Sequence, residues 1–147
     1  MEEEHYAFIL VADEKYWNRL RERQQTGKET HVFVRKNLVG PTEARKLLFY
    51  VKKQKQIRGV ADFVERLTGD HKELWEKFGA ETFFESFEEY ETFAEGRKKM
   101  TFIRFKNFTE LANPQPKEIL SGVLGSLVWF RPKYANQRIT ELLTAEV

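Results

Sequence analysis

The order of apolar and polar positions along the chain predicts five short strands. Continuous apolar runs at residues 7–12 and 47–51 are typical of strands that are buried on both faces. Residues 99–108 alternate apolar with polar, which is typical of a strand with two different faces. Together with the polar connection at residues 53–56, these patterns predict strands at residues 5–12, 31–35, 46–53, 57–67 and 99–108.

Helical spacing predicts helices between and after these strands. Asp13 is placed to cap a helix over residues 14–24, and Ser86, with Glu89 three residues later, begins a helix that ends near residue 94. A further helix is expected at residues 72–78, where Gly79 stops it, and a terminal one at 134–144. Residues 113–116 are expected to break the chain, and residues 127–130 are a candidate for a last short strand.

Two strands carry details that bear on packing. Gly59 inside its strand predicts a bulge or a close backbone approach. Strict alternation along residues 99–108 places four side chains on one face, and these are Phe102, Arg104, Lys106 and Phe108.

The order of elements favours an α+β fold rather than regular βα alternation. The strands are joined by a hairpin-length connection, and two short helices separate the fourth strand from the fifth. We therefore expect a small mixed, largely antiparallel β pseudo-barrel with helices packed outside. The length of 147 residues predicts a single domain over residues 1–147.

The amino-acid composition excludes a disordered chain, a membrane-spanning helix and every site that needs cysteine. With 41% apolar and 14% aromatic residues the chain can build a core, and without cysteine it forms no disulfide, Fe–S cluster or thiolate zinc site. The apolar runs are far shorter than a membrane helix, and the start Met-Glu-Glu-Glu is unlike a signal peptide. These features predict a soluble, cytoplasmic protein that does not contact membranes.

The net charge of +2 conceals a separation of charge along the chain. Residues 28–66 hold ten Lys or Arg against four acids, and residues 97–108 hold five against none. Residues 70–95, which are predicted to be helical, hold nine acids against two lysines. Because the basic segments coincide with predicted strands, the sequence predicts a basic sheet face that binds a polyanion, with nucleic acid (RNA or DNA) as the expected partner.

Basic and aromatic residues occur together at the candidate binding positions. Phosphate binding uses Lys and Arg, while base stacking uses flat rings. The candidate nucleic-acid-binding residues are Arg35, Lys36, Asn37, Lys52, Lys53, Lys55, Arg58, Arg97, Lys98, Lys99, Arg104 and Lys106. The candidates for base stacking are Tyr50, Phe102, Phe108 and Trp129. In the alternative interpretation, Phe102 and Phe108 pack under the helices while Arg104 and Lys106 reach to water.

Motifs for metal or nucleophilic catalysis are not found. The three histidines, His5, His31 and His71, have no metal-ligand spacing, and no phosphate-binding glycine loop occurs. Glu88 and Glu91 share a helix face but are typical of a solvated acidic surface. We predict no catalytic residue, no metal and no cofactor.

Three segments carry a resemblance to a known superfamily. The stretches at residues 32–36, 46–51 and 57–63, followed by short helices and the strand at 100–108, resemble the PUA-like superfamily, which includes PUA, ASCH, EVE and YTH domains. The resemblance implies a PUA-like pseudo-barrel that binds RNA or a modified, flipped base. It also suggests the N-terminal targeting domain of an archaeal McrB-type restriction protein, with further domains in a longer parent protein.

Three functions follow from the sequence as hypotheses. The first is a nucleic-acid-binding module that is not catalytic by itself. The second is a small amidohydrolase-like enzyme acting on modified nucleosides or RNA, as the resemblance to ASCH proteins implies, although no matching Gly-x-Lys arrangement is found. The third is a protein-interaction domain that binds a basic partner through Glu88, Glu89 and Glu91.

Overall fold

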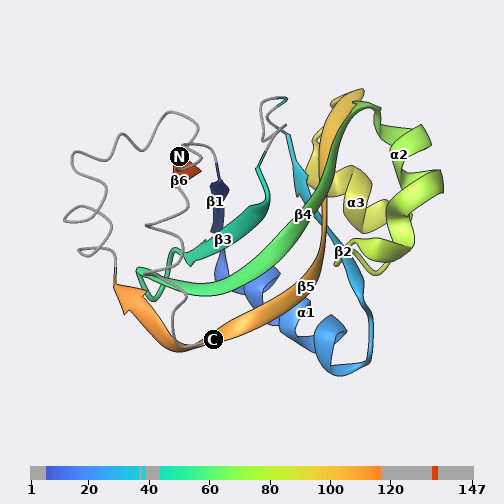
Figure 1. The fold of residues 1–147 in the computed structure, drawn as a ribbon. Coiled ribbons are helices and arrows are strands. Elements are labelled where there is room, and N and C mark those ends of the chain that lie inside the picture. Colours follow the sequence, from blue (N-terminus) through green and yellow to red (C-terminus); the bar gives the residue numbers. More distant parts are fainter. Residues whose placement is uncertain (1–5, 37, 39–43, 117–133, 136–147) are drawn as a thin grey trace.

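In the computed structural model, which describes residues 6–36, 38, 44–116 and 134–135, the strands form one mixed sheet in the order β2-β5-β4-β3-β1-β6 (Figure 1). β1 and β3 are parallel, and the other pairs are antiparallel. The strands are β1 (Ala7–Ala12), β2 (Thr30–Arg35), β3 (Lys46–Val51), β4 (Gln56–Asp70), β5 (Lys99–Pro116) and β6 (Tyr134–Ala135). The helices are α1 (Glu14–Gln25), α2 (His71–Phe78), the 3₁₀ helix η1 (Gly79–Glu81) and α3 (Phe87–Ala94).

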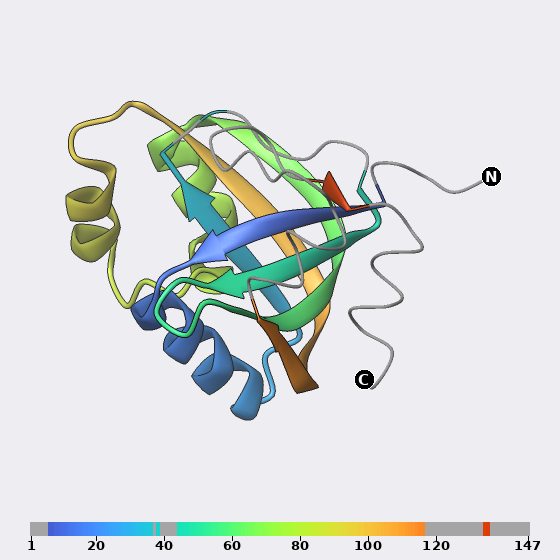
Figure 2. The ribbon, with the colours of Figure 1, turned by 90° about the vertical axis from the view of Figure 1, so that its left-hand side faces the viewer.

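The long strands β4 and β5 curve the sheet into a half-barrel (Figures 1 and 2). Their pairing shifts register at three places, between Ile57 and Gly59, Val60 and Asp62, and Phe63 and Glu65. Each such bulge bends the strand and increases its twist. The predicted α+β pseudo-barrel with helices outside is therefore confirmed.

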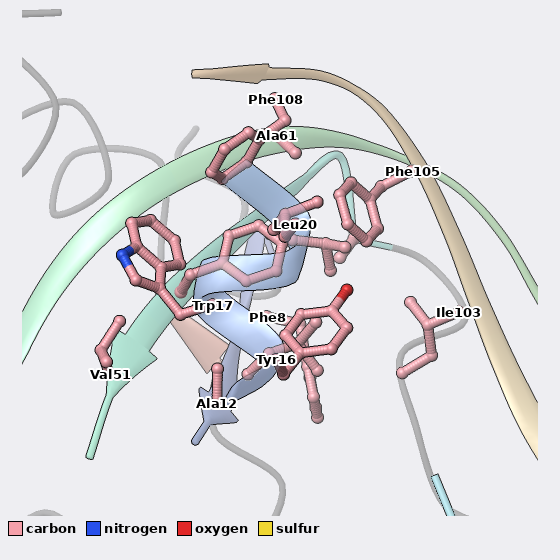
Figure 3. Close-up of a cluster of buried hydrophobic side chains, with 14 residues drawn as sticks. Phe8, Ala12, Tyr16, Trp17, Leu20, Val51, Ala61, Ile103, Phe105 and Phe108 are labelled. Atoms are coloured by element: carbon pink, nitrogen blue, oxygen red, sulfur yellow. The ribbon is translucent and has the colours of Figure 1, made fainter. Parts of the chain in front are cut away.

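The concave face of the sheet packs on α1 to form the main core (Figure 3). Asp13 caps α1 by accepting a hydrogen bond from the Tyr16 backbone N–H at 2.7 Å, as predicted. Trp17 of this helix contacts the rings of Phe49 and Phe108. A side-chain carbon on Gly59 would lie 2.8 Å from the Phe108 ring and 2.9 Å from the Trp17 ring, so the predicted close approach is confirmed.

A bulge at Asn107 overturns the predicted facing of β5. Asn107 has a φ of +54°, and two residues of β5, Asn107 and Phe108, lie opposite the single residue Ala61 of β4. Alternation is therefore interrupted, and Phe108 joins Phe105 in the concave core. Phe102 lies on the other face, in the core beneath α2 and α3. The prediction of one face shared by Phe102 and Phe108 is wrong.

Several predicted element ends also differ. β5 continues to Pro116 because its last residues pair with Gln56 and Ile57, so the expected break at residues 113–116 is wrong. Tyr134 and Ala135 pair with β1 as β6 rather than beginning a helix. The candidate strand at residues 127–130 and the rest of the expected terminal helix lie outside the described residues.

The ends of the short helices also depend on tertiary contacts. Gly79 follows α2 with a right-handed φ of −55°, where its missing side chain makes room for the Trp75 ring. α3 ends at Glu95, which adopts a left-handed φ of +53°. Within the described residues, no helix has the length and apolar character needed to cross a membrane.

Candidate nucleic-acid interface

One side chain at the end of β2 reaches a ring at the start of β1. Strand alternation places Arg35 on the concave face of the sheet together with His31 and Phe33. The Arg35 guanidinium carbon lies 5.9 Å from the centre of the Phe8 ring. β1 and β2 are not neighbours in the sheet, so this contact marks the open end of the half-barrel, which we call the mouth.

Arg35 places a positive charge inside the mouth. Its Nη1 atom is buried and has no hydrogen-bond partner within the described part of the chain. Burial lowers the pKa of Arg35, yet a guanidinium stays protonated at neutral pH. A buried charge without an anionic partner is costly, so this arrangement favours the binding of an anion.

Hydroxyl groups lie on the same face beside Arg35. Thr101 of β5 is the register partner of Arg35, and side chains of directly paired residues face the same side. The Thr101 Oγ1 atom lies 3.1 Å from Thr68 Oγ1 of β4. By the same register, Arg66 shares the face of Ile103, which belongs to the concave core. Thr101 is fully buried, so of these two hydroxyl residues only the exposed Thr68 can contact a phosphate oxygen.

A basic turn lies next to the mouth. It consists of Arg97, Lys98 and Lys99, which join α3 to β5 and are all exposed. Lys99 is two residues before Thr101, a distance of about 7 Å along a strand. Among the described residues these three side chains make no ion pair. The structure thus brings four of the predicted binding residues, Arg35 and the basic turn, to one end of the molecule.

Lys36 follows Arg35 but is already engaged. Its Nζ atom donates a hydrogen bond to Glu95 Oε1 at 3.2 Å and lies 5.1 Å from the centre of the Phe93 ring. Asn37, which was predicted to contact a base edge, lies outside the described residues.

A second basic group lies at the opposite end of β4. Lys52, Lys53 and Lys55 occupy the exposed turn between β3 and β4, and Arg58 follows at the start of β4. Like Arg35, Arg58 has a buried nitrogen, Nε, without a hydrogen-bond partner among the described residues, but it lies apart from the basic turn. Lys53 forms an ion pair with Glu14 at 3.2 Å. Because β4 runs the length of the sheet, these residues do not form one surface with the basic turn (Figure 1).

Arg104 and Lys106 lie on the convex face, away from the mouth. Arg104 donates hydrogen bonds to Glu81 at 2.9 and 3.1 Å and also pairs with Glu65. Its guanidinium covers the Phe78 ring at 4.5 Å. These contacts make Arg104 a structural link between β5 and η1, and they satisfy its charge within the fold.

The predicted stacking residues are part of the core. The exposed fractions are 6% for Tyr50, 0% for Phe102 and 4% for Phe108, so these rings present no free face to a base. The alternative interpretation is confirmed for Phe102, which packs under the helices, but it is wrong for Arg104, which pairs with Glu81 and Glu65 instead of reaching to water. Trp129 lies outside the described residues. Phe8, Thr68 and Thr101 were not predicted as site residues, since strand pairing brings Thr101 and Thr68 near Arg35 and the curvature of the sheet brings Phe8 there.

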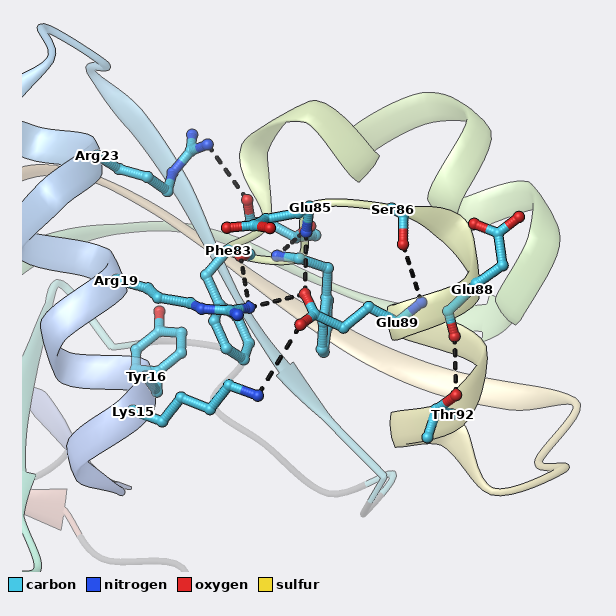
Figure 4. Close-up of polar contacts among 12 residues, drawn as sticks. Lys15, Tyr16, Arg19, Arg23, Phe83, Glu85, Ser86, Glu88, Glu89 and Thr92 are labelled. Atoms are coloured by element: carbon cyan, nitrogen blue, oxygen red, sulfur yellow. Dashed lines mark hydrogen bonds and ion pairs between the residues drawn. The ribbon is translucent and has the colours of Figure 1, made fainter.

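Of the three predicted acidic interaction residues, Glu89 is engaged within the fold. Glu89 of α3 accepts a hydrogen bond from Arg19 of α1 at 2.7 Å, and Lys15 lies 3.9 Å away (Figure 4). This contact makes the pKa of the Glu89 carboxyl lower than usual, mainly through the hydrogen bond from Arg19. No group of three or more metal-ligating side chains occurs among the described residues. Glu88 and Glu91, the other members of the predicted acidic surface, are exposed.

The fold is similar to that of solved ASCH structures. The chain is similar to the ASCH protein from Zymomonas mobilis at 18% identity, with a TM-score of 0.73 over 97% of this chain and 96% of that one. A tyrosine-to-phenylalanine mutant of that protein gives a TM-score of 0.74 at 18% identity over 95% and 97% of the two chains. A serine-to-alanine mutant gives 0.70 at 20% identity over the same shares.

These structural similarities confirm the predicted PUA-like fold as an architecture. Comparison with curated proteins gives no match. A family model described as "Domain of unknown function (DUF365)" matches residues 13–128. Because this match spans most of the chain, the chain belongs to the family described as Domain of unknown function (DUF365).

Proposed function

We propose that this chain is a nucleic-acid-binding module, not catalytic by itself, that binds the backbone of an RNA or DNA strand at the mouth. The observation that carries the proposal is the Arg35 guanidinium, which has a buried nitrogen without a hydrogen-bond partner among the described residues. A planar guanidinium matches the geometry of phosphate oxygens and forms paired hydrogen bonds with them.

The surroundings of Arg35 support a polymer rather than an isolated anion. The basic turn of residues 97–99 adds three exposed cations. These residues precede Thr101, the register partner of Arg35, by two to four positions along the chain. A nucleic-acid strand carries a negative charge at every nucleotide, so one phosphate at Arg35 leaves its neighbours within reach of these cations. Because the rings that were predicted to stack on bases are buried, we base the proposal on phosphate contacts and not on base stacking.

Fluorescence anisotropy with labelled single-stranded RNA and DNA tests this function. We expect Arg35→Gln to weaken binding by at least about tenfold, since it removes a charge-assisted contact. The matched control Lys53→Gln removes one positive charge at the other end of β4 and is expected to change affinity by less than about twofold. Equal affinities for the two variants, or no binding of wild-type protein at low salt, would contradict the proposal.

We place the module in the cytoplasm and consider it a targeting domain of a longer protein, such as an archaeal McrB-type restriction protein. The absence of catalysis is tested by incubating the protein with RNA and with acylated nucleosides. Release of product that depends on Arg35 would favour the amidohydrolase-like alternative.

A further inference from the structure

Glu95 is an acidic residue in a strained position next to the basic turn. It follows α3 with a left-handed φ of +53°, a conformation that costs free energy for a residue with a side chain. Gly96 follows with a φ of +81°, and the basic turn of residues 97–99 begins directly after it. A glycine or asparagine at position 95 would meet the backbone requirement at lower cost, so the backbone alone does not account for a carboxylate here.

The Glu95 carboxylate binds the ammonium group of Lys36, the residue that directly follows β2. Its Oε1 atom accepts the 3.2 Å hydrogen bond from Lys36, the residue after Arg35. The Lys36 side chain is 33% exposed and that of Glu95 is 68% exposed. The Phe93 ring supports the Lys36 ammonium from the other side, so this lysine stays beside α3 even without the carboxylate.

An exposed ion pair of this kind is weak and exchangeable. Water and salt screen it, and its two long side chains lose freedom when they pair. A phosphate that arrives at the mouth carries the same charge as the carboxylate and meets Arg35 and the basic turn as well. Such a phosphate can therefore replace Glu95 as the partner of Lys36.

We propose that Glu95 is an affinity-determining residue that competes with nucleic-acid phosphate for Lys36. This inference rests on the proposed function and adds a residue that opposes binding. In the free protein Glu95 neutralises Lys36, and in the complex Lys36, which lies on the α3 side of the sheet, binds a further phosphate of the strand that is held at Arg35 and the basic turn. The carboxylate thus lowers affinity for any polyanion, and a ligand must engage the whole basic end of the molecule to displace it.

The test compares two glutamates of the same region by oligonucleotide anisotropy. Glu95→Gln is expected to tighten binding about three- to fivefold at low salt, since it releases Lys36 to bind phosphate. Glu91→Gln is the matched control, because Glu91 is exposed on α3 and makes no ion pair among the described residues. We expect it to change affinity by less than about twofold.

A double-mutant cycle separates competition for Lys36 from general repulsion. We expect the gain from Glu95→Gln to disappear when Lys36→Gln is also present. A gain that persists without Lys36, or no gain beyond that of Glu91→Gln, would overturn the inference while wild-type binding still supports the proposed function. No binding of the oligonucleotide by wild-type protein would overturn both.

Discussion

Arg35 and His31 illustrate how position along one strand decides the chemistry of a side chain. Both lie on the concave face of β2, but His31 sits deep in the core and Arg35 at the open end. The His31 Nδ1 atom accepts a hydrogen bond from Arg23 at 3.1 Å, and Nε2 lies 3.0 Å from Gln24 Oε1. His31 is thus satisfied within the fold, whereas Arg35 has a buried nitrogen without a hydrogen-bond partner among the described residues.

The His31 network predicts a loss of stability in mild acid. Burial, and then the nearby Arg23 charge, lower the pKa of His31 from 6.5 to about 4. Between these two values the unfolded chain takes up a proton that the folded chain excludes, so stability falls as pH falls and levels off below pH 4. We expect the His31 contribution to the free energy of unfolding to fall by about 2 kcal/mol between pH 7 and about pH 5.

Urea unfolding of wild-type protein and His31→Asn at both pH values measures this contribution. The variant is expected to be less stable at pH 7 but to lose less stability on acidification than wild-type protein. The same loss in both proteins would show that His31 does not remain neutral in the fold.

At the scale of elements, the curvature of the sheet comes from the bulges at which the pairing of β4 with β5 shifts register. The patterns of apolar residues were sufficient to predict strands β1 to β5, helix α1 and both acidic helices, because each has its own periodicity. The facing of Phe108 was not predictable, since the bulge at Asn107 depends on which residue of β4 it opposes. The length of β5 could not be predicted from the sequence pattern for the same reason, because the strand extends to Pro116 only through its pairing with β4.

Gly59 offers a direct test of how α1 packs in the half-barrel. A methyl group at this position would meet the rings of Phe108 and Trp17 below 3 Å, and both rings are held by the core around them. We expect Gly59→Ala to lower the free energy of unfolding by about 1–3 kcal/mol through overpacking.

The control for this prediction is Gly69→Ala on the same strand. A methyl group at Gly69 meets nothing within 4 Å, so its effect on the urea midpoint is expected to be small. Equal midpoints for both variants would mean that α1 does not pack against β4 as described.

At the scale of the whole molecule, the charged groups fall at separate places. The basic turn and Arg35 share one end of the sheet, while the basic residues of the β3–β4 turn lie at the other (Figure 1). Sequence analysis named the members of both groups but could not separate them, because distance along a folded strand is not visible in a charge count. The position of Thr68 and Thr101 beside Arg35 could not be predicted, since it requires the register of the strands, and the contact of Phe8 with Arg35 joins two strands that are not neighbours in the sheet.

The salt dependence of binding tests the location of the interface most directly. Two triple variants remove the same charge from opposite ends, Arg97→Gln/Lys98→Gln/Lys99→Gln and Lys52→Gln/Lys53→Gln/Lys55→Gln. Affinity for a single-stranded oligonucleotide is measured between about 50 and 200 mM salt. We expect the first variant to lose affinity and to reduce the slope of log affinity against log salt by about 2. The slope falls because a complex with fewer phosphate contacts releases fewer counterions from the nucleic acid when it forms. The second variant is expected to keep the wild-type slope, and equal changes in both would contradict binding at the mouth.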